Sequence, residues 1–318
     1  DPSEHFSIKI YTGNNVAETK STDFQVDLLW IKCRNNARSH MLYDSTRGFG
    51  NDKHIVPNTN VIAGGDVDGG QVEDGERGFI GSISSGGFYT NSGAAGMHLV
   101  GATSNTYVAW NWKANGGTTS SSTTGTVGHG LGVKPHAIWR RQTGASGNWA
   151  NAMPHIEGAK LMMFNGTNAW FSASGMSSYN TSTFVDGSGA GSVTSVAYCF
   201  TDIQGFSKFG SYTGNGNVDG AFIYTGFKPA FIMMKRTDTT GNWIIKDSSI
   251  DTDNIATQVI YPNLTNAENA AQDMDLLSNG FKHRSTEGDG NTDGGTYIYQ
   301  AFAEQPFVTS SGVPATAR

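Results

Sequence analysis

The sequence predicts an all-β protein made of tandem antiparallel β-sandwich modules of the jelly-roll type. Three observations lead to this prediction. Glycine supplies 42 of the 318 residues, against a typical share of about 7%. The apolar runs are short and bounded by Gly, Pro or Thr, which is typical of strands joined by turns. The same phrases also occur more than once along the chain, which indicates repeated structural units.

The repeated phrases are clearest between residues 6–45 and 209–248. Both contain Tyr-Thr-Gly-Asn, then an apolar run that ends in basic residues, and later an Asp-Ser pair. A middle copy is abbreviated, because it lacks the opening Tyr-Thr-Gly strand and has the linker GGTTSSSTTG (116–125) in its place. The copies are nearer a hundred residues than the ~40–50 of a propeller blade. Tandem sandwiches are therefore favoured over a propeller.

Three imperfect repeats follow from this comparison. We expect a β-sandwich at 1–116, an abbreviated β repeat at 117–203, and a second full sandwich with a C-terminal tail at 204–318. Such modules in a row would build an elongated, rigid object whose loops can vary without disturbing the core.

Individual segments have strand character. In TYVAWNW (106–112) the residues alternate, so Tyr107, Ala109 and Asn111 should face one side and the residues between them the other. The segment TNAENAAQDMDLL (265–277) is the only helix candidate, with Thr265 as N-cap and Glu268 at the capping-box spacing.

Composition excludes several classes of partner. The net charge of −6 and the pI near 5.7 argue against nucleic acid or an anionic membrane surface, since both attract basic proteins. No apolar run approaches the ~20 residues that cross a bilayer. The first residues are Asp-Pro rather than Met, so we expect a preceding segment. Cys33 and Cys199 lie in different repeats and are predicted to be buried, reduced thiols.

The sequence shows no catalytic signature. The patterns GxSxG, HExxH, GxxxxGK[ST] and CxxC are all missing. GNGNVDG (214–220) and GHGLG (128–132) have neither a βαβ context nor a paired nucleophile, so turns are the better interpretation. The eight histidines are scattered singly, which disfavours zinc. We therefore predict a protein that is not an enzyme and has no cofactor, with calcium as the one open candidate.

The calcium candidate is EGDGNTDGG (287–295). It places oxygen-bearing side chains at alternate positions, namely Glu287, Asp289, Asn291 and Asp293. The loop lacks the glycine at the sixth position and the glutamate at the twelfth that an EF-hand needs. A solvated hairpin loop remains the favoured alternative.

Aromatic residues suggest a glycan platform, since Trp and Tyr rings stack on sugars. Trp149 and Trp243 occupy matching positions in the repeated Gly-Asn-Trp, and we take them as the candidates for exposure. Core packing is the alternative.

Basic residues recur at the ends of the apolar runs, as Arg140–Arg141 and Lys235–Arg236. We expect them to form salt bridges with the Asp-Ser segment of a neighbouring strand, for example with Asp247.

The third copy, with "YTGNG", "YTGFKPAFIMMKRTDTTGNW", "LLSNGFK" and "GGTYIYQAFAEQPF", resembles a family of virion proteins of tailed bacteriophages from marine and cyanobacterial phages. The first copy is similar in "WIKCR" and "TYVAWNWK", and the second in "VGHGLGVKPHAI" and "VAYCF". The likeness covers nearly the whole chain. It implies a non-enzymatic structural protein of the virion surface, either a tail fibre or spike or a head fibre or decoration, that contacts the host.

Two alternatives stay open. One is a polysaccharide-cleaving tailspike, which would need two carboxylates roughly 5–10 Å apart on facing strands; the other is a purely architectural capsid or tail component. The implied partners are other virion proteins and further copies of the chain, with a trimer favoured by analogy with fibres. Host surface glycans are a further candidate partner, whereas nucleic acid and membrane insertion are not expected.

Overall fold

A computed structural model describes residues 1–68, 78–91, 93, 99–114, 125–172, 175–187 and 193–305. The protein is all-β, with antiparallel β-sandwich modules, as predicted. Its six sheets each draw their strands from one of three successive parts of the chain, which we call modules 1, 2 and 3.

Module 1 contains β1 (Phe6–Thr12), β2 (Glu18–Ser21), β3 (Leu28–Cys33), β4 (Met41–Asp44), β5 (Phe79–Ser84), β6 (Gly87–Asn91) and β7 (Thr106–Trp112), after a 3₁₀ turn at Pro2–Glu4. Module 2 contains β8 (Gly125–Gly128), β9 (Ala137–Gln142), β10 (Ala150–Met153), β11 (Glu157–Met162), β12 (Phe171–Ser172), β13 (Met176–Ser177), β14 (Thr183–Asp186) and β15 (Ser195–Phe200). Module 3 contains β16 (Ser207–Thr213), β17 (Phe222–Tyr224), β18 (Phe231–Arg236), β19 (Trp243–Asp247), β20 (Ala256–Val259), β21 (Asn269–Leu277), β22 (Gly280–His283) and β23 (Thr296–Phe302).

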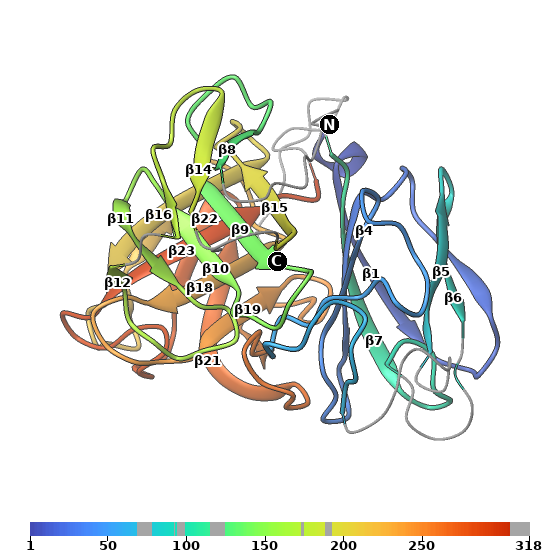
Figure 1. Ribbon diagram of the computed structural model, residues 1–318. Coiled ribbons are helices and arrows are strands. Elements are labelled where there is room, and N and C mark those ends of the chain that lie inside the picture. Colours follow the sequence, from blue (N-terminus) through green and yellow to red (C-terminus); the bar gives the residue numbers. More distant parts are fainter. Residues whose placement is uncertain are drawn as a thin grey trace.

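Each module is a sandwich of an inner and an outer sheet. The inner sheets have the orders β1-β7-β3-β4, β12-β11-β10-β9-β15 and β16-β23-β18-β19. The outer sheets have the orders β2-β6-β5, β13-β14-β8 and β17-β22-β21-β20. In module 1, Figure 1 shows β5 and β6 on the outside, with β1, β4 and β7 between them and the other two modules.

The two faces of every inner sheet are both buried, but in different cores. One face packs on the module's own outer sheet, as Tyr107 and Ala109 of β7 do. The other face joins a central cluster that contains residues of all three modules, including Trp110, Trp139 and Phe231. The predicted alternation of β7 is thus confirmed, since consecutive residues of this strand lie in two different cores.

The central cluster also corrects the expected shape. Trp30 of module 1 lies edge-on to Trp139 of module 2 at 5.9 Å, and Phe231 of module 3 lies 5.5 Å from Trp110. Burying these large rings removes several hundred Å² of apolar surface from water, which strongly favours association. The modules therefore surround one shared core, and the expectation of an elongated row of sandwiches is wrong.

The segment predicted to be helical is the strand β21. Met274 and Leu276 alternate into the core of module 3, and the strand pairs with β20 on one side and β22 on the other. Thr265 and Glu268, expected to cap a helix, instead bond to module 1 through a backbone carbonyl and a carboxylate. Pairing with two neighbours overrides a composition that favours a helix.

Among the described residues, the inner sheet of module 2 has no strand beyond its closing strand. In modules 1 and 3 the closing strand of the inner sheet is covered by the opening strand, as β1 covers β7 and β16 covers β23. In module 2 the corresponding closing strand is β15, which ends the sheet order, and no other described strand pairs with its outer edge. The linker GGTTSSSTTG lies largely outside the described residues.

Candidate functional site

Several buried titratable side chains and tryptophans lie at the contacts between modules. We call these contacts seams. Each is named by the two modules that meet, with the module that supplies the Trp or His side chain first: seam 1–3, seam 2–1 and seam 3–2. In the first two sets of contacts described below, equivalent side chains donate in one direction around the central core, from module 1 to module 3, from module 2 to module 1 and from module 3 to module 2. The three modules of this one chain are thus arranged with approximate threefold symmetry around the central core.

The first set of seam contacts contains the two predicted platform residues. The indole N–H of Trp149 donates to the carbonyl oxygen of Val56 at 2.9 Å across seam 2–1, and that of Trp243 to Met163 at 2.7 Å across seam 3–2. His40 takes the equivalent place in module 1, where its Nε2 lies 3.0 Å from the carbonyl oxygen of Tyr261.

Both tryptophans are fully buried, with an exposed fraction of 0%. The prediction that Trp149 and Trp243 form a glycan platform is therefore wrong. Their matching positions in the repeat reflect a shared structural role, because burying an indole requires a partner for its N–H.

An asparagine positions each seam residue. The side-chain oxygens of Asn58, Asn165 and Asn263 accept the backbone N–H of His40, Trp149 and Trp243, respectively. Each asparagine lies two residues after the residue whose carbonyl oxygen accepts the bond across the seam. The three segments are Val56-Pro-Asn, Met163-Phe-Asn and Tyr261-Pro-Asn. The recurring motif of an apolar residue, any residue and Asn is therefore a sequence signal for these contacts between modules.

His40 differs from its two equivalents because it is titratable. Its Nδ1 accepts the indole N–H of Trp30 at 2.9 Å, so Nε2 carries the proton and donates to Tyr261. Burial, reinforced by the nearby Lys32, lowers the pKa of His40 well below its ordinary value. The ring is held neutral and acts as a structural donor.

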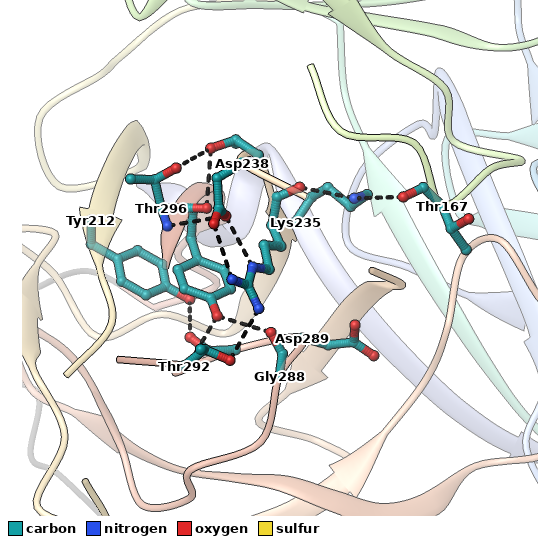
Figure 2. A network of polar contacts seen from close by, with 12 residues as sticks. Thr167, Tyr212, Lys235, Asp238, Gly288, Asp289, Thr292 and Thr296 are labelled. Atoms are coloured by element: carbon teal, nitrogen blue, oxygen red, sulfur yellow. Dashed lines mark hydrogen bonds and ion pairs between the residues drawn. The ribbon is translucent and has the colours of Figure 1, made fainter. Parts of the chain in front are cut away.

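The second set of seam contacts uses buried cations. Lys32, Arg141 and Lys235 occupy equivalent positions on β3, β9 and β18, and all three have an exposed fraction of 0%. Across the seams they donate to the carbonyl oxygens of Thr265, Val61 and Thr167, respectively. Figure 2 shows the ammonium group of Lys235 directed at Thr167.

Burial also governs the charge of these cations. Desolvation lowers the pKa of both Lys32 and Lys235 to about 8 and that of Arg141 to about 10. The predicted salt bridges to Asp-Ser segments are wrong for Arg141 and Lys235, because carbonyl oxygens are their hydrogen-bond acceptors. Arg140 does form an ion pair, but with Asp186 of its own module at 2.9 Å; likewise Arg236 pairs with Asp238.

The third set of seam contacts uses acidic residues. Asp247 of module 3 accepts the indole N–H of Trp110 of module 1 at 2.5 Å, and Asp44 of module 1 accepts the hydroxyl of Tyr198 of module 2 at 2.7 Å. The equivalent of these aspartates in module 2 is Met153, and here Gln300 accepts the indole N–H of Trp139 at 2.7 Å instead.

The two aspartates have different surroundings. Arg47 pairs with Asp44 at 2.5 Å. Asp247 accepts backbone N–H groups from Ser249 and Ile250, but burial dominates and raises its pKa to about 7. A carboxyl titrating near neutrality often marks an active site, yet both oxygens of Asp247 are already engaged by buried donors.

The predicted calcium residues serve a turn rather than a cation. Asp289 accepts two hydrogen bonds from Asn242, Glu287 accepts one from the backbone of Gln272, and Asn291 is buried with its amide bonded to Asn217 and Ser285. Figure 2 shows Asp289 turned away from Thr292 and Gly288. The side chain of Asp293 is exposed.

These oxygens do not converge, and no group of three or more metal-ligating side chains gathers anywhere in the described ranges. The described structure therefore does not bring Glu287, Asp289, Asn291 and Asp293 together as one set of ligands. Carboxylates at alternate positions suit calcium only when the loop curls around the ion, whereas these point to separate partners.

An open depression lies at seam 1–3. Its volume is about 610 Å³, and it is lined mainly by residues of module 3, among them Asn242, Tyr261, Glu268 and Asn269, with Ala37 from module 1. Glu268 is held by Arg34 at 2.7 Å. The depression is open and its lining is mixed, about as apolar as polar, so it lacks the enclosed, predominantly apolar character usual for a small-molecule site.

Two further predictions concern the cysteines and the membrane. Cys33 and Cys199 are both free thiols, as predicted, but Cys199 is only partly buried. Within the described ranges, no helix has the length and apolarity that a bilayer crossing requires.

Comparison with known proteins gives a family and no relative of known function. Neither the curated proteins nor the solved structures include a match to this chain. One family model matches twice, over residues 1–127 and 118–306, and together these matches cover nearly all of the sequence. The chain therefore belongs to the family described as a domain of unknown function, DUF7483.

Proposed function

We propose that this chain is a non-enzymatic structural protein of a bacteriophage virion, displayed on the particle surface as a tail or head appendage that contacts the host. The proposal combines the likeness of the repeated phrases to virion proteins with the way the chain uses its polar groups. It includes other virion proteins and further copies of the chain as partners.

The observation that carries the non-enzymatic part is the engagement of three buried side chains with shifted pKa values. Lys32, Lys235 and Asp247 have strongly shifted pKa values, and each is buried and bonded to another module. Catalytic groups must reach a substrate. These groups instead tie three sandwiches together, which suits a durable particle component.

Gold-labelled antibody imaging of intact virions tests the location. A serum raised against this chain should label projections of the tail or head. Even labelling of the capsid lattice would overturn the appendage and favour an architectural component. Unlabelled particles together with soluble chain in the lysate would overturn the virion assignment.

A further inference from the structure

We propose that the outer sheet of module 3 carries a binding site for neutral glycans, formed by the rings of Phe222 and Tyr224. This inference names a site and ligand class for the host contact proposed above, but it stands on the residues described here and does not require a virion location.

The two rings lie side by side on the exposed face of an edge strand. On β17, Ile223 points into the sandwich core while Phe222 and Tyr224 are 47% and 64% exposed. Side chains two apart on a strand share a face and are about 7 Å from one another. The pair thus presents two aromatic surfaces in one plane of the sheet.

Glycines fix the positions of both rings. Phe222 lies over Gly280, where an added Cβ would come within 2.9 Å of its ring, and Tyr224 lies against Gly226, where the corresponding distance is 3.5 Å. The rings therefore rest on backbone. Contact with the backbone restricts the rotamers that these rings can adopt, which lowers the entropy cost of a ligand that stacks on them.

The fold itself does not require aromatic residues at these positions. The register of the outer sheets aligns β17 with β2 and β8, because Phe281, Phe88 and Phe184 are the buried partners on the neighbouring strand. The residues equivalent to the ring pair are Thr19 and Ser21 in module 1, and Thr126 and Gly128 in module 2.

A second pair of contacts supports this alignment. Thr22 and Thr225 each follow the strand directly and donate to the carbonyl oxygens of Phe24 and Phe227 at 2.6 Å. Two of three modules thus fold with small residues where module 3 exposes two aromatic rings. Two adjacent exposed rings that the fold does not require are therefore better explained by a ligand than by packing.

Charged groups beside the rings narrow the ligand class. Lys282 lies directly opposite Phe222 and pairs with Asp219 at 2.6 Å, and Arg284 pairs with Asp275 at 2.6 Å. The two cations and two anions cancel, so the rim attracts neither an anionic nor a cationic ligand. Its ammonium, guanidinium and carboxylate groups remain suited to hydroxyl groups.

A sugar matches both halves of this surface. The C–H face of a pyranose ring is attracted to the electron-rich face of an aromatic ring, and its hydroxyls can bond to the charged rim. A protein partner fits less well, because a stable interface buries roughly 1,200–2,000 Å² around an apolar centre. Two rings with an ion-paired rim make a much smaller apolar area.

The test is binding of the full chain to an array of neutral and anionic oligosaccharides. Biotinylated chain assembled on streptavidin would compensate for weak single contacts through avidity. The double variant F222T/Y224S introduces the residues of module 1, so folding should be preserved; an unchanged thermal midpoint checks this. V16T is the matched control, since Val16 is also exposed, at 57%, but lies in module 1.

We expect neutral oligosaccharides to be retained by the wild-type chain, V16T and Y224F, and at least a tenfold loss of binding in F222T/Y224S. Retention of no array member, retention of anionic members alone, or unchanged binding by F222T/Y224S would each overturn the site. Glycan binding with unlabelled virions would overturn only the proposed location, whereas labelled virions without glycan binding would overturn only this site.

Discussion

The indole N–H of Trp110 on β7 donates to Oδ2 of Asp247 on β19, joining two residues 137 positions apart and in different modules. Asp44 and Tyr198 make the equivalent bond between modules 1 and 2. These contacts place titratable groups between the modules, so pH should act on the association of the three sandwiches.

The first prediction concerns Asp247. Burial raises its pKa from 3.8 to about 7, so the folded chain holds this proton more tightly than the unfolded chain. Its stabilising contribution is therefore fully present below pH 3.8 and is lost as the pH rises through 7. D247N should remove this pH dependence. Because an amide offers one acceptor oxygen where the carboxyl group offers two, it also leaves either Trp110 or the backbone N–H groups of Ser249 and Ile250 without an acceptor, which should cost about 1–3 kcal/mol.

Urea unfolding at several pH values between 5 and 8 measures both effects. D293N is the matched control, because Asp293 is exposed. If D247N and the wild-type chain show the same change of unfolding free energy over this range, Asp247 does not titrate as described.

The second prediction concerns the buried lysines. Desolvation lowers the pKa of Lys32 and Lys235 from 10.5 to about 8. Between these values the unfolded chain binds the protons that the folded chain has released, so stability should rise as the pH increases from 8 toward 10. Each lysine could contribute on the order of 2 kcal/mol to this rise.

Chemical unfolding of K32M and K235M at pH 8 and pH 10 measures the rise. Each variant should show a smaller increase than the wild-type chain, whereas K113M, which alters an exposed lysine, should keep it. An undiminished increase in K32M and K235M would contradict the buried, desolvated positions.

The third prediction separates the buried tryptophans from ligand binding. W149F and W243F each remove an indole N–H and leave the carbonyl oxygen of Val56 or Met163 without its donor. We expect a loss of about 1–3 kcal/mol in unfolding free energy, with glycan retention on the array unchanged. If W149F or W243F instead lost glycan binding and kept the unfolding free energy of the wild-type chain, these tryptophans would be exposed ligand-binding residues after all.

The fourth prediction concerns calcium. Because Glu287, Asp289 and Asn291 bond to separate protein groups, neither excess EDTA nor added calcium should move the thermal midpoint. Differential scanning fluorimetry provides the measurement. A calcium-dependent rise of several degrees, removed by D289N, would show that the loop binds the ion.

The sequence predicted features that depend on one strand and its neighbours. The alternation of Tyr107 and Trp110 follows from the period of a strand with two buried faces. The second copy lacks the opening Tyr-Thr-Gly phrase, and among the described residues no strand pairs with the outer edge of β15. Both predictions depend on short segments that can be compared between the copies.

Features that depend on contact between modules were predicted wrongly. Trp149 lies just before β10, so strand period alone does not decide whether it faces solvent or a core. It is buried against Phe164 and Tyr198 and bonds to Val56 of module 1. The segment 265–277 has the composition of a helix, but Met274 and Leu276 are held in a strand by their neighbours. The exposure of Phe222 and Tyr224 could not be predicted from the sequence, because it becomes evident only when the register of the sheets aligns β17 with β2 and β8.

Calorimetry of the intact chain tests the central claim, that three sandwiches share one core, most directly. The shared core and the seams predict one cooperative transition, with equal calorimetric and van't Hoff enthalpies, and predict that W149F shifts the whole transition. Two or three separable transitions, or a W149F effect confined to one of them, would contradict a common core and return the modules to independent domains.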